Sequence, residues 1–201
     1  GKSHQLFHIQ LDTYNKGNES SNVDGLPNQL TYQDVVTLAK SDIPTKQTRS
    51  LRSGFSVIPD KEGETPFLRS ARTIDQDFFS MFNVPFIYGG PWQKEIDEKP
   101  LKVVVIAKKL NDKLFDGKNS VGKTINLNKQ LFTITGVIDD WQPTPRFYDV
   151  NHDAFADAEQ LFIPFSLIPV LELPSWGNNN SWKPEEITTY EDKLRSETMW
   201  L

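Results

Sequence analysis

The fold is decided by residues 100–140, which read PLKVVVIAKKLNDKLFDGKNSVGKTINLNKQLFTITGVIDD. An aliphatic run at 101–106 is followed by Leu110 and Leu114 at helical spacing, and Asp116-Gly117 is typical of a helix end. Apolar and polar residues then alternate on both sides of a polar tip at 128–129. The order predicts a strand, a helix, a loop and a two-stranded hairpin.

The loop of this stretch, residues 117–124, has the spacing of a phosphate-binding loop, GxxxxGK[ST], which would make Lys123 a phosphate ligand and Thr124 a magnesium ligand. Such a loop needs a strand before it and a helix after it, so that the helix N-terminus faces the phosphate. Here the predicted helix comes first and the predicted strand follows. We therefore interpret the glycines as a helix stop and a turn, and we predict no nucleotide, no cofactor and no catalytic residue. The competing hypothesis is an NTP-binding enzyme.

The composition excludes several function classes. With 201 residues and 37% hydrophobic residues, the chain can bury a substantial core. Its net charge of −5, without a dense run of Lys and Arg, argues against binding to nucleic acid. The lack of cysteine excludes disulfides and thiolate metal sites. No apolar run approaches the roughly 20 residues of a membrane-spanning helix.

The remaining patterns predict an α+β fold with two folding units. A capping box of Thr31 and Asp34 indicates a helix start, and residues 93–99 form a charged surface loop. The other expected elements are a strand at 6–11, a hairpin of 51–57 with 67–71, a short aromatic helix at 75–83, an extended segment at 86–88, a strand at 161–165 and a helix at 184–195.

Two groups of acidic residues are candidate sites. His152 lies among Asp149, Asp153 and Asp157, but their spacing matches no strong metal-binding signature, so we predict solvated loop residues and no metal. Asp139-Asp140 could form an acid/base pair. Adjacent residues after a strand point apart, however, and favour a turn.

Tryptophans gather late in the chain, where the sequence shows no dominant period. Exposed tryptophans favour interfaces or sugar stacking, while buried ones cap a core beneath long loops. For the pair Trp176 and Trp182 we retain a possible partner surface. For Trp141 we predict packing on the core.

An ordered set of motifs between about residues 70 and 140 resembles a known family. The set comprises DFFSMF at 77–82, GGPW at 89–92, VVVI at 103–106, Leu114-Phe115, VGKTI at 121–125 and FTITGVI at 132–138. It is similar to the extracytoplasmic core domain of MacB/FtsX-type ABC transporter permeases. The arginine that the family has after the two glycines is replaced by Pro91-Trp92, so that detail is not carried over.

The resemblance implies a non-catalytic domain outside the cytoplasm, between the first and second membrane helices of an inner-membrane permease. It implies a porter-like α/β subdomain beginning with residues 1–72, an inserted β-rich subdomain at 73–182, and a return segment at 183–201 that looks truncated. The implied partners are an ABC ATPase subunit or domain, a periplasmic adaptor protein and a second permease in a homo- or heterodimer. An extracytoplasmic carbohydrate- or peptide-binding module is the alternative.

The patterning also predicts a single core cluster, because elements adjacent in sequence usually pack together. Its expected members are Phe78, Phe82, Val103, Val105, Leu110, Leu114, Phe132 and Ile134.

Overall fold

A computed structural model describes residues 6–7, 9, 30–141, 158–174 and 188–196 of the chain. The helices are α1 (Tyr32–Leu38), α2 (Asp77–Met81), the 3-10 helix η2 (Lys94–Asp97), α3 (Lys108–Phe115), α4 (Leu167–Leu171) and α5 (Tyr190–Ser196). The strands are β1 (Ser50–Ile58), β2 (Phe67–Ile74), β3 (Phe86–Gly89), β4 (Val103–Ala107), β5 (Thr124–Leu127), β6 (Gln130–Ile138) and β7 (Leu161–Pro164). The fold is α+β, as the sequence predicts, with a sheet-rich core.

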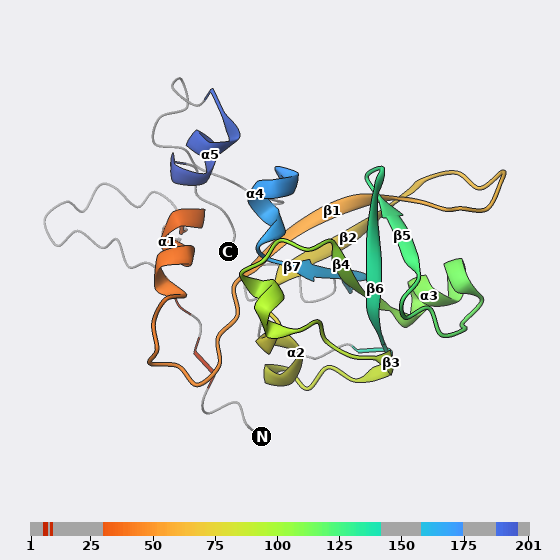
Figure 1. Cartoon of the computed structure of the whole chain (residues 1–201), viewed down its shortest axis with the longest axis horizontal. Helices are drawn as coiled ribbons and strands as arrows, with labels where there is room; N and C mark the ends of the chain where they lie inside the picture. Colours follow the sequence, from red (N-terminus) through yellow and green to blue (C-terminus); the bar gives the residue numbers. More distant parts are fainter. Residues whose placement is uncertain (1–5, 8, 10–29, 142–157, 175–187, 197–201) are drawn as a thin grey trace, which may run out of the picture.

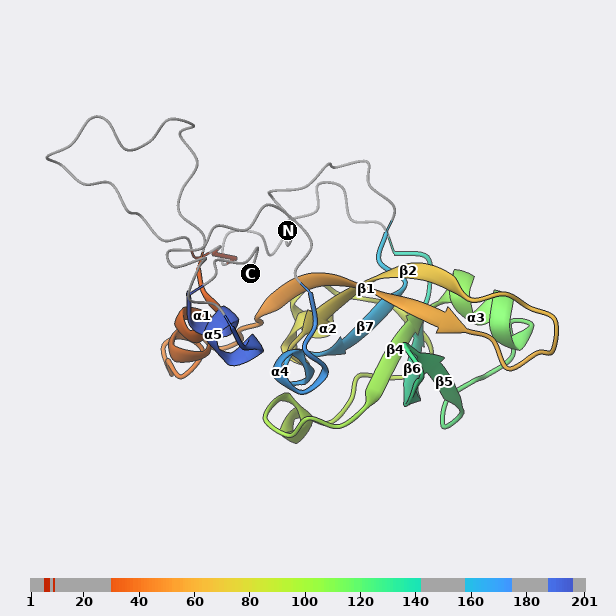
Figure 2. The same cartoon turned by 90° about the horizontal axis from the view of Figure 1, so that it is seen from above.

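The strands form one sheet that closes on itself. Its order is β3-β6-β4-β7-β2-β1-β5, and β5 pairs with β1 as well as with β6. β2 and β4 flank β7, the former parallel and the latter antiparallel to it. Helices α1 and α5 lie together at one end of the sheet, and α3 lies at the other end (Figures 1 and 2).

The central stretch folds as its sequence predicts. Asp116 and Gly117 end α3 with φ values of 53° and 72°, a left-handed conformation that stops a helix. Asn128 and Lys129 both have positive φ, which is the geometry of the tight turn that joins twisted antiparallel strands. β5 and β6 consequently pair in register from Thr124↔Thr133 to Leu127↔Gln130.

The predictions for the first helix and the first hairpin are confirmed. The Thr31 hydroxyl accepts a hydrogen bond from the Asp34 amide, and the Asp34 carboxylate accepts one from the Thr31 amide, so the capping box is complete. β1 and β2 pair antiparallel over eight residues of each strand, from Ser50↔Ile74 to Val57↔Phe67.

The prediction of a single core cluster is wrong. Leu110, Phe132 and Ile134 lie in one cluster, on which Leu114 packs. Phe78 and Val105 lie in a second cluster, together with the partly buried Phe82 and Val103. The physical reason is that β4 is covered on both sides, so its successive residues point alternately into the two clusters.

One predicted domain boundary falls inside a strand, and two predicted elements are only partly covered by the described residues. The predicted boundary between residues 72 and 73 falls within β2, which pairs with β1 on one side and β7 on the other. The strand at 6–11 lies mostly outside the described residues, and of the helix at 184–195 the described part contains α5. Among the described residues, no helix has the length and apolar character needed to cross a bilayer.

Candidate functional site

Backbone amides of the loop at residues 117–124 donate hydrogen bonds to acceptors within the protein itself. Gly122 donates its amide to the Ile134 carbonyl at 2.8 Å and Lys123 donates to the Ser120 carbonyl at 3.0 Å. The amides of Lys118 and Val121 also have internal acceptors. A phosphate-binding loop needs such amides free to converge on the phosphate, so this loop has the wrong geometry for one.

A buried pair of side chains, Ser120 and Asn111, holds the same loop in place. The Ser120 hydroxyl donates to Asn111 Oδ1 at 2.5 Å, and Asn111 Nδ2 donates to the Lys118 carbonyl at 3.0 Å. Both side chains are at most 1% exposed. α3 precedes the loop and β5 begins at Thr124, which is the reverse of the required order. Lys123 Nζ lies 5.4 Å from the centroid of the Phe115 ring, as part of the turn's surface.

The other candidate residues from the sequence have different outcomes. Asp139 Oδ1 accepts the Asp140 amide at 2.8 Å, and the two residues follow β6 in irregular backbone without the predicted turn. Trp141 packs against the second core cluster, with its ring centroid 5.9 Å from that of Phe78, so its predicted role is confirmed. Trp176 and Trp182 lie outside the described residues, as do His152 and its aspartates. Within the described part of the chain, no group of three His, Cys, Asp or Glu side chains is placed to hold a metal.

One surface cavity of about 400 Å³ lies between the turn after β1 and the segment of α3 and β5. Its polar lining includes Asp60, Lys61, Glu64, Lys113 and Asp116, and Lys61 pairs with Glu64 at 3.7 Å. Carboxylates and ammonium groups are thus mixed in one open space. This lining favours no single class of ligand.

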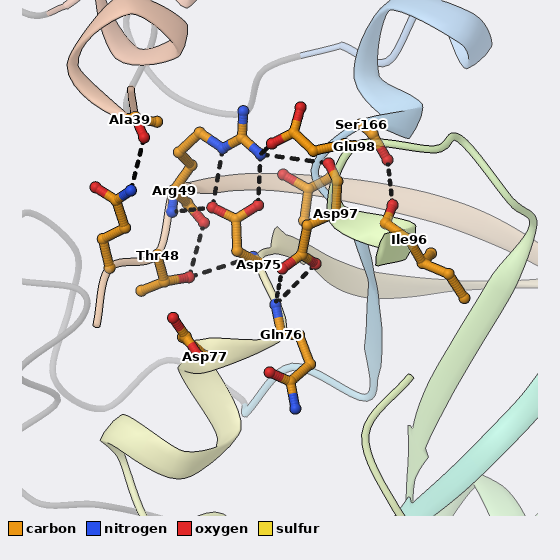
Figure 3. A network of polar contacts seen from close by, with 12 residues as sticks. Ala39, Thr48, Arg49, Asp75, Gln76, Asp77, Ile96, Asp97, Glu98 and Ser166 are labelled. Carbon is orange, nitrogen blue, oxygen red and sulfur yellow. Dashed lines mark hydrogen bonds and ion pairs between the residues drawn. The ribbon is translucent and has the colours of Figure 1, made fainter. Parts of the chain in front are cut away.

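The most organised polar cluster is one that the sequence did not indicate. We call it the Arg49 clasp, and it consists of Arg49, Asp75, Gln76 and Asp97, which Figure 3 shows, together with Trp92, which donates to Asp97. Arg49 precedes β1, Asp75 and Gln76 lie between β2 and α2, and Asp97 ends η2. The clasp therefore ties together three segments that are distant in sequence.

Arg49 and Asp75 form the charged half of the clasp. The guanidinium donates from Nη2 to Asp75 Oδ1 at 2.7 Å and from Nε to Oδ2 at 2.9 Å. The Arg49 backbone amide donates to Oδ2 at 2.8 Å. Their side chains are 11% and 8% exposed, so the pair is shielded from water and salt.

Asp97 forms the other half and is 7% exposed. Its carboxylate accepts hydrogen bonds from Trp92 Nε1 and from the Gln76 amide, both at 2.9 Å. Burial, together with the nearby Asp75 charge, raises the pKa of Asp97 to about 6. The hydrogen bonds from Trp92 and Gln76 and the charge of Arg49 oppose that rise in pKa.

Residues 93–99 are mostly exposed, as expected for a charged surface loop, but the segment contains η2 and its Asp97 is buried in the clasp. Trp92 is 2% exposed and Asp97 is 7% exposed, and Ser166 at the start of α4 donates to the Ile96 carbonyl at 3.0 Å. Trp92 lies five residues before Asp97 and supplies an N–H that this buried carboxylate accepts. Since both carboxylates accept hydrogen bonds from several segments, the clasp is suited to holding those segments together.

Comparison with known proteins identifies the fold. The profile of the MacB-like periplasmic core domain matches residues 1–190. A search of curated proteins returned no significant match.

Solved structures agree with the family match. The periplasmic region of MacB from Actinobacillus actinomycetemcomitans is 20% identical with a TM-score of 0.55, and the alignment covers 74% of this chain and 61% of that one. The extracellular domain of the noncanonic ABC-type transporter YknZ from Gram-positive bacteria is 13% identical with a TM-score of 0.53, covering 84% and 82%. A domain assigned to a permease protein from Porphyromonas gingivalis is 19% identical with a TM-score of 0.50, covering 76% and 61%.

The chain thus spans about three fifths of the MacB and Porphyromonas gingivalis structures. At these identities the structures show a shared fold, while the family is shown by the profile, which spans nearly the whole sequence. The chain belongs to the MacB-like periplasmic core domain family, whose members are periplasmic or extracellular domains of ABC transporter permeases.

Proposed function

We propose that this domain is a non-catalytic part of an inner-membrane ABC permease, which couples ATP-driven motion of the membrane helices to export, or to a substrate or adaptor outside the membrane. The observation that carries the proposal is the family match over residues 1–190. The ATPase would be a separate subunit or domain, and the permease would work as a homo- or heterodimer. A periplasmic adaptor protein is the proposed partner on the outer side.

The architecture suits a part that transmits force. A sheet that closes on itself resists shear, because each strand except β3 is hydrogen-bonded to a neighbour on both of its edges. Core clusters cover both sides of β4, and the Arg49 clasp adds charged bonds at the end of β2. Motion applied at one end of such a body reaches the other end with little internal deformation.

The division into porter-like and inserted β-rich subdomains stays part of the proposal. The pairing of β1 and β2 with the rest of the sheet favours a first boundary between α1 and β1, at about residues 40–49. On this division α1 and α5 belong to the porter-like part. The strands belong to the inserted part.

Location and coupling can each be tested with one reporter in the full-length permease. Lys109 is exposed on α3, and the described chain around it contains no cysteine, so Lys109→Cys provides a unique label in this domain. A membrane-impermeant maleimide should label it from outside intact spheroplasts. Coupling predicts that an ATP analogue bound to the ATPase changes energy transfer between this label and a dye in the bilayer. Labelling that requires permeabilised cells would contradict the proposed location.

The second candidate function is carbohydrate or peptide binding, which the two tryptophans in the Asn-rich segment favour. Aromatic faces stack on sugars and fill pockets at protein interfaces. A glycan or peptide screen with saturable binding that Trp176→Ala and Trp182→Ala abolish would support this candidate. Binding unchanged in both variants, or no binding, would leave the coupling proposal without a ligand-binding role.

A further inference from the structure

Tyr32, Phe165 and Arg49 form a series of ring contacts, which we call the column, and it joins α1 to the Arg49 clasp. The rings of Tyr32 and Phe165 lie nearly parallel, with an interplanar angle of 2° and centroids 5.5 Å apart. The Arg49 guanidinium carbon lies 4.7 Å from the centroid of the same Phe165 ring. Tyr32 begins α1, Phe165 precedes α4, and Arg49 precedes β1, so the column crosses from the helices to the sheet.

The column continues without a gap into the sheet. Arg49 holds the Asp75 carboxylate through a planar fork, which fixes the guanidinium plane in place. Asp75 immediately follows β2, and its amide donates to the Thr48 hydroxyl at 3.2 Å. Gln76 then connects this end of β2 to Asp97 on η2. Phe165 is fully buried, so the contacts of its ring are sheltered from solvent.

We propose that Arg49 is a positioning residue that helps to carry movement of α1 to the sheet, beside the direct packing of Val35 of α1 in the first core cluster. This inference rests on the proposed coupling function and names the residues that would carry it. Arg49 suits the role because its flat guanidinium stacks on a ring and forks onto a carboxylate at the same time, which a lysine cannot do. Loss of the fork frees the side chain from the sheet, and loss of the Tyr32 ring frees α1 from the stack.

The first arm of the test measures rigidity in the 201-residue chain. Spin labels at Gln33→Cys on α1 and Lys109→Cys on α3 lie on exposed positions at opposite ends of the molecule (Figure 1). The chain has no natural cysteine to interfere. Wild type should give a narrow distance distribution, and Arg49→Ala and Tyr32→Ala should each roughly double its width.

Matched variants separate the stack from a general loss of packing. Tyr32→Phe keeps the ring and should keep the narrow distribution. Arg49→Lys keeps the charge without the fork and should broaden the distribution almost as much as Arg49→Ala. Unchanged width in Arg49→Ala, with its circular dichroism at the wild-type level, would overturn the inference. If Arg49→Ala does not fold, Arg49→Lys and Tyr32→Ala decide in its place.

The second arm separates this inference from the proposed function. In the full-length permease with its ATPase, an ATP analogue should displace both labels relative to the bilayer in wild type. In Arg49→Lys, ATPase activity should be unchanged, the α1 label should move as in wild type and the α3 label should move less than in wild type. Displacement of both labels equal to that in wild type would overturn the role of Arg49 and leave coupling intact. Displacement of neither label in wild type would contradict the proposed coupling, whatever the first arm shows.

Discussion

Arg49 donates three hydrogen bonds to the carboxylate of Asp75, two from its guanidinium and one from its own backbone amide. These bonds join two residues that are 26 apart in sequence, at the place where β1 begins and β2 ends. A bidentate pair shielded from water is stronger and more directional than an exposed one. The bond therefore contributes to stability as well as to the arrangement of the segments around it.

Removal of one partner of this pair should be costly. Arg49→Ala leaves the Asp75 carboxylate buried without its charge partner, and the free energy of unfolding should fall by about 3–5 kcal/mol. Urea denaturation measures the change. Lys108→Ala is the control, because Lys108 pairs with Asp112 on an exposed face of α3. A loss in Arg49→Ala no larger than in Lys108→Ala would contradict the account of the clasp.

Asp97 predicts a specific dependence of stability on pH. Its pKa of about 6 lies above its ordinary value, so the folded chain holds this proton over a range in which the unfolded chain has released it. The free energy of unfolding should therefore fall as pH rises from about 4 to about 6, by about 1–3 kcal/mol, and level off above that range. Asp97→Asn should remove this slope. Denaturation midpoints at several pH values give the measurement, and an equal slope in both proteins would refute the assignment to Asp97.

Gly136 in β6 should not tolerate a side chain. A Cβ at this position would lie 2.6 Å from the Gly90 carbonyl oxygen and 2.7 Å from the Phe86 ring. We expect Gly136→Ala to lower the free energy of unfolding by about 1–3 kcal/mol through overpacking between β3 and β6. Gly90→Ala is the matched control, because a Cβ there meets no atom within 4 Å. Equal stability of the two variants would show that β3 does not approach β6 this closely.

For substitutions in and around the first core cluster, the loss in the free energy of unfolding should increase with the burial of the side chain that is removed. Phe132 is fully buried and its ring meets that of Phe55 edge-on at 6.1 Å, so Phe132→Ala should cost about 3–5 kcal/mol. Leu114 is partly buried, and Leu114→Ala should cost less. Lys123→Ala lies in a turn and should cost least of the three. Chemical denaturation gives the order, and a Lys123 variant less stable than Leu114→Ala would invert it.

The same turn should not bind nucleotide. Its amides are committed to Ile134, Ser120 and other internal acceptors, so titration with ATP or GTP and magnesium should release no heat of binding. Micromolar affinity that Lys123→Ala abolishes would overturn this assignment and favour the NTP-binding hypothesis.

Local patterns predicted the local structure well. The capping box at Thr31 and the alternation around residues 128–129 each involve neighbouring residues, whose chemistry alone determines the helix start and the turn. The split of the core was also readable, because an uninterrupted aliphatic run such as 103–106 indicates a strand covered on both faces. The prediction of one cluster places residues 103 and 105 on the same face as Leu110 and Phe132, which the alternation along β4 rules out.

The Arg49 clasp could not be found in this way. Arg49 and Asp97 are 48 residues apart, and both occur among charged residues that resemble a solvated surface. Their burial depends on how η2 folds over the end of β2, which is set by tertiary packing. The alternation of polar and apolar residues carries no information on such a contact.

The central claim is that this domain moves with the ATPase cycle, and the most direct measurement follows the Lys109→Cys label in the full-length permease. Energy transfer to a bilayer dye is compared between the nucleotide-free transporter and the transporter with a bound ATP analogue. The control is an ATPase whose nucleotide-binding lysine is replaced. Coupling to the ATPase predicts a shift in energy transfer in the intact transporter that disappears in the control. Identical energy transfer in both nucleotide states of the intact transporter would contradict it.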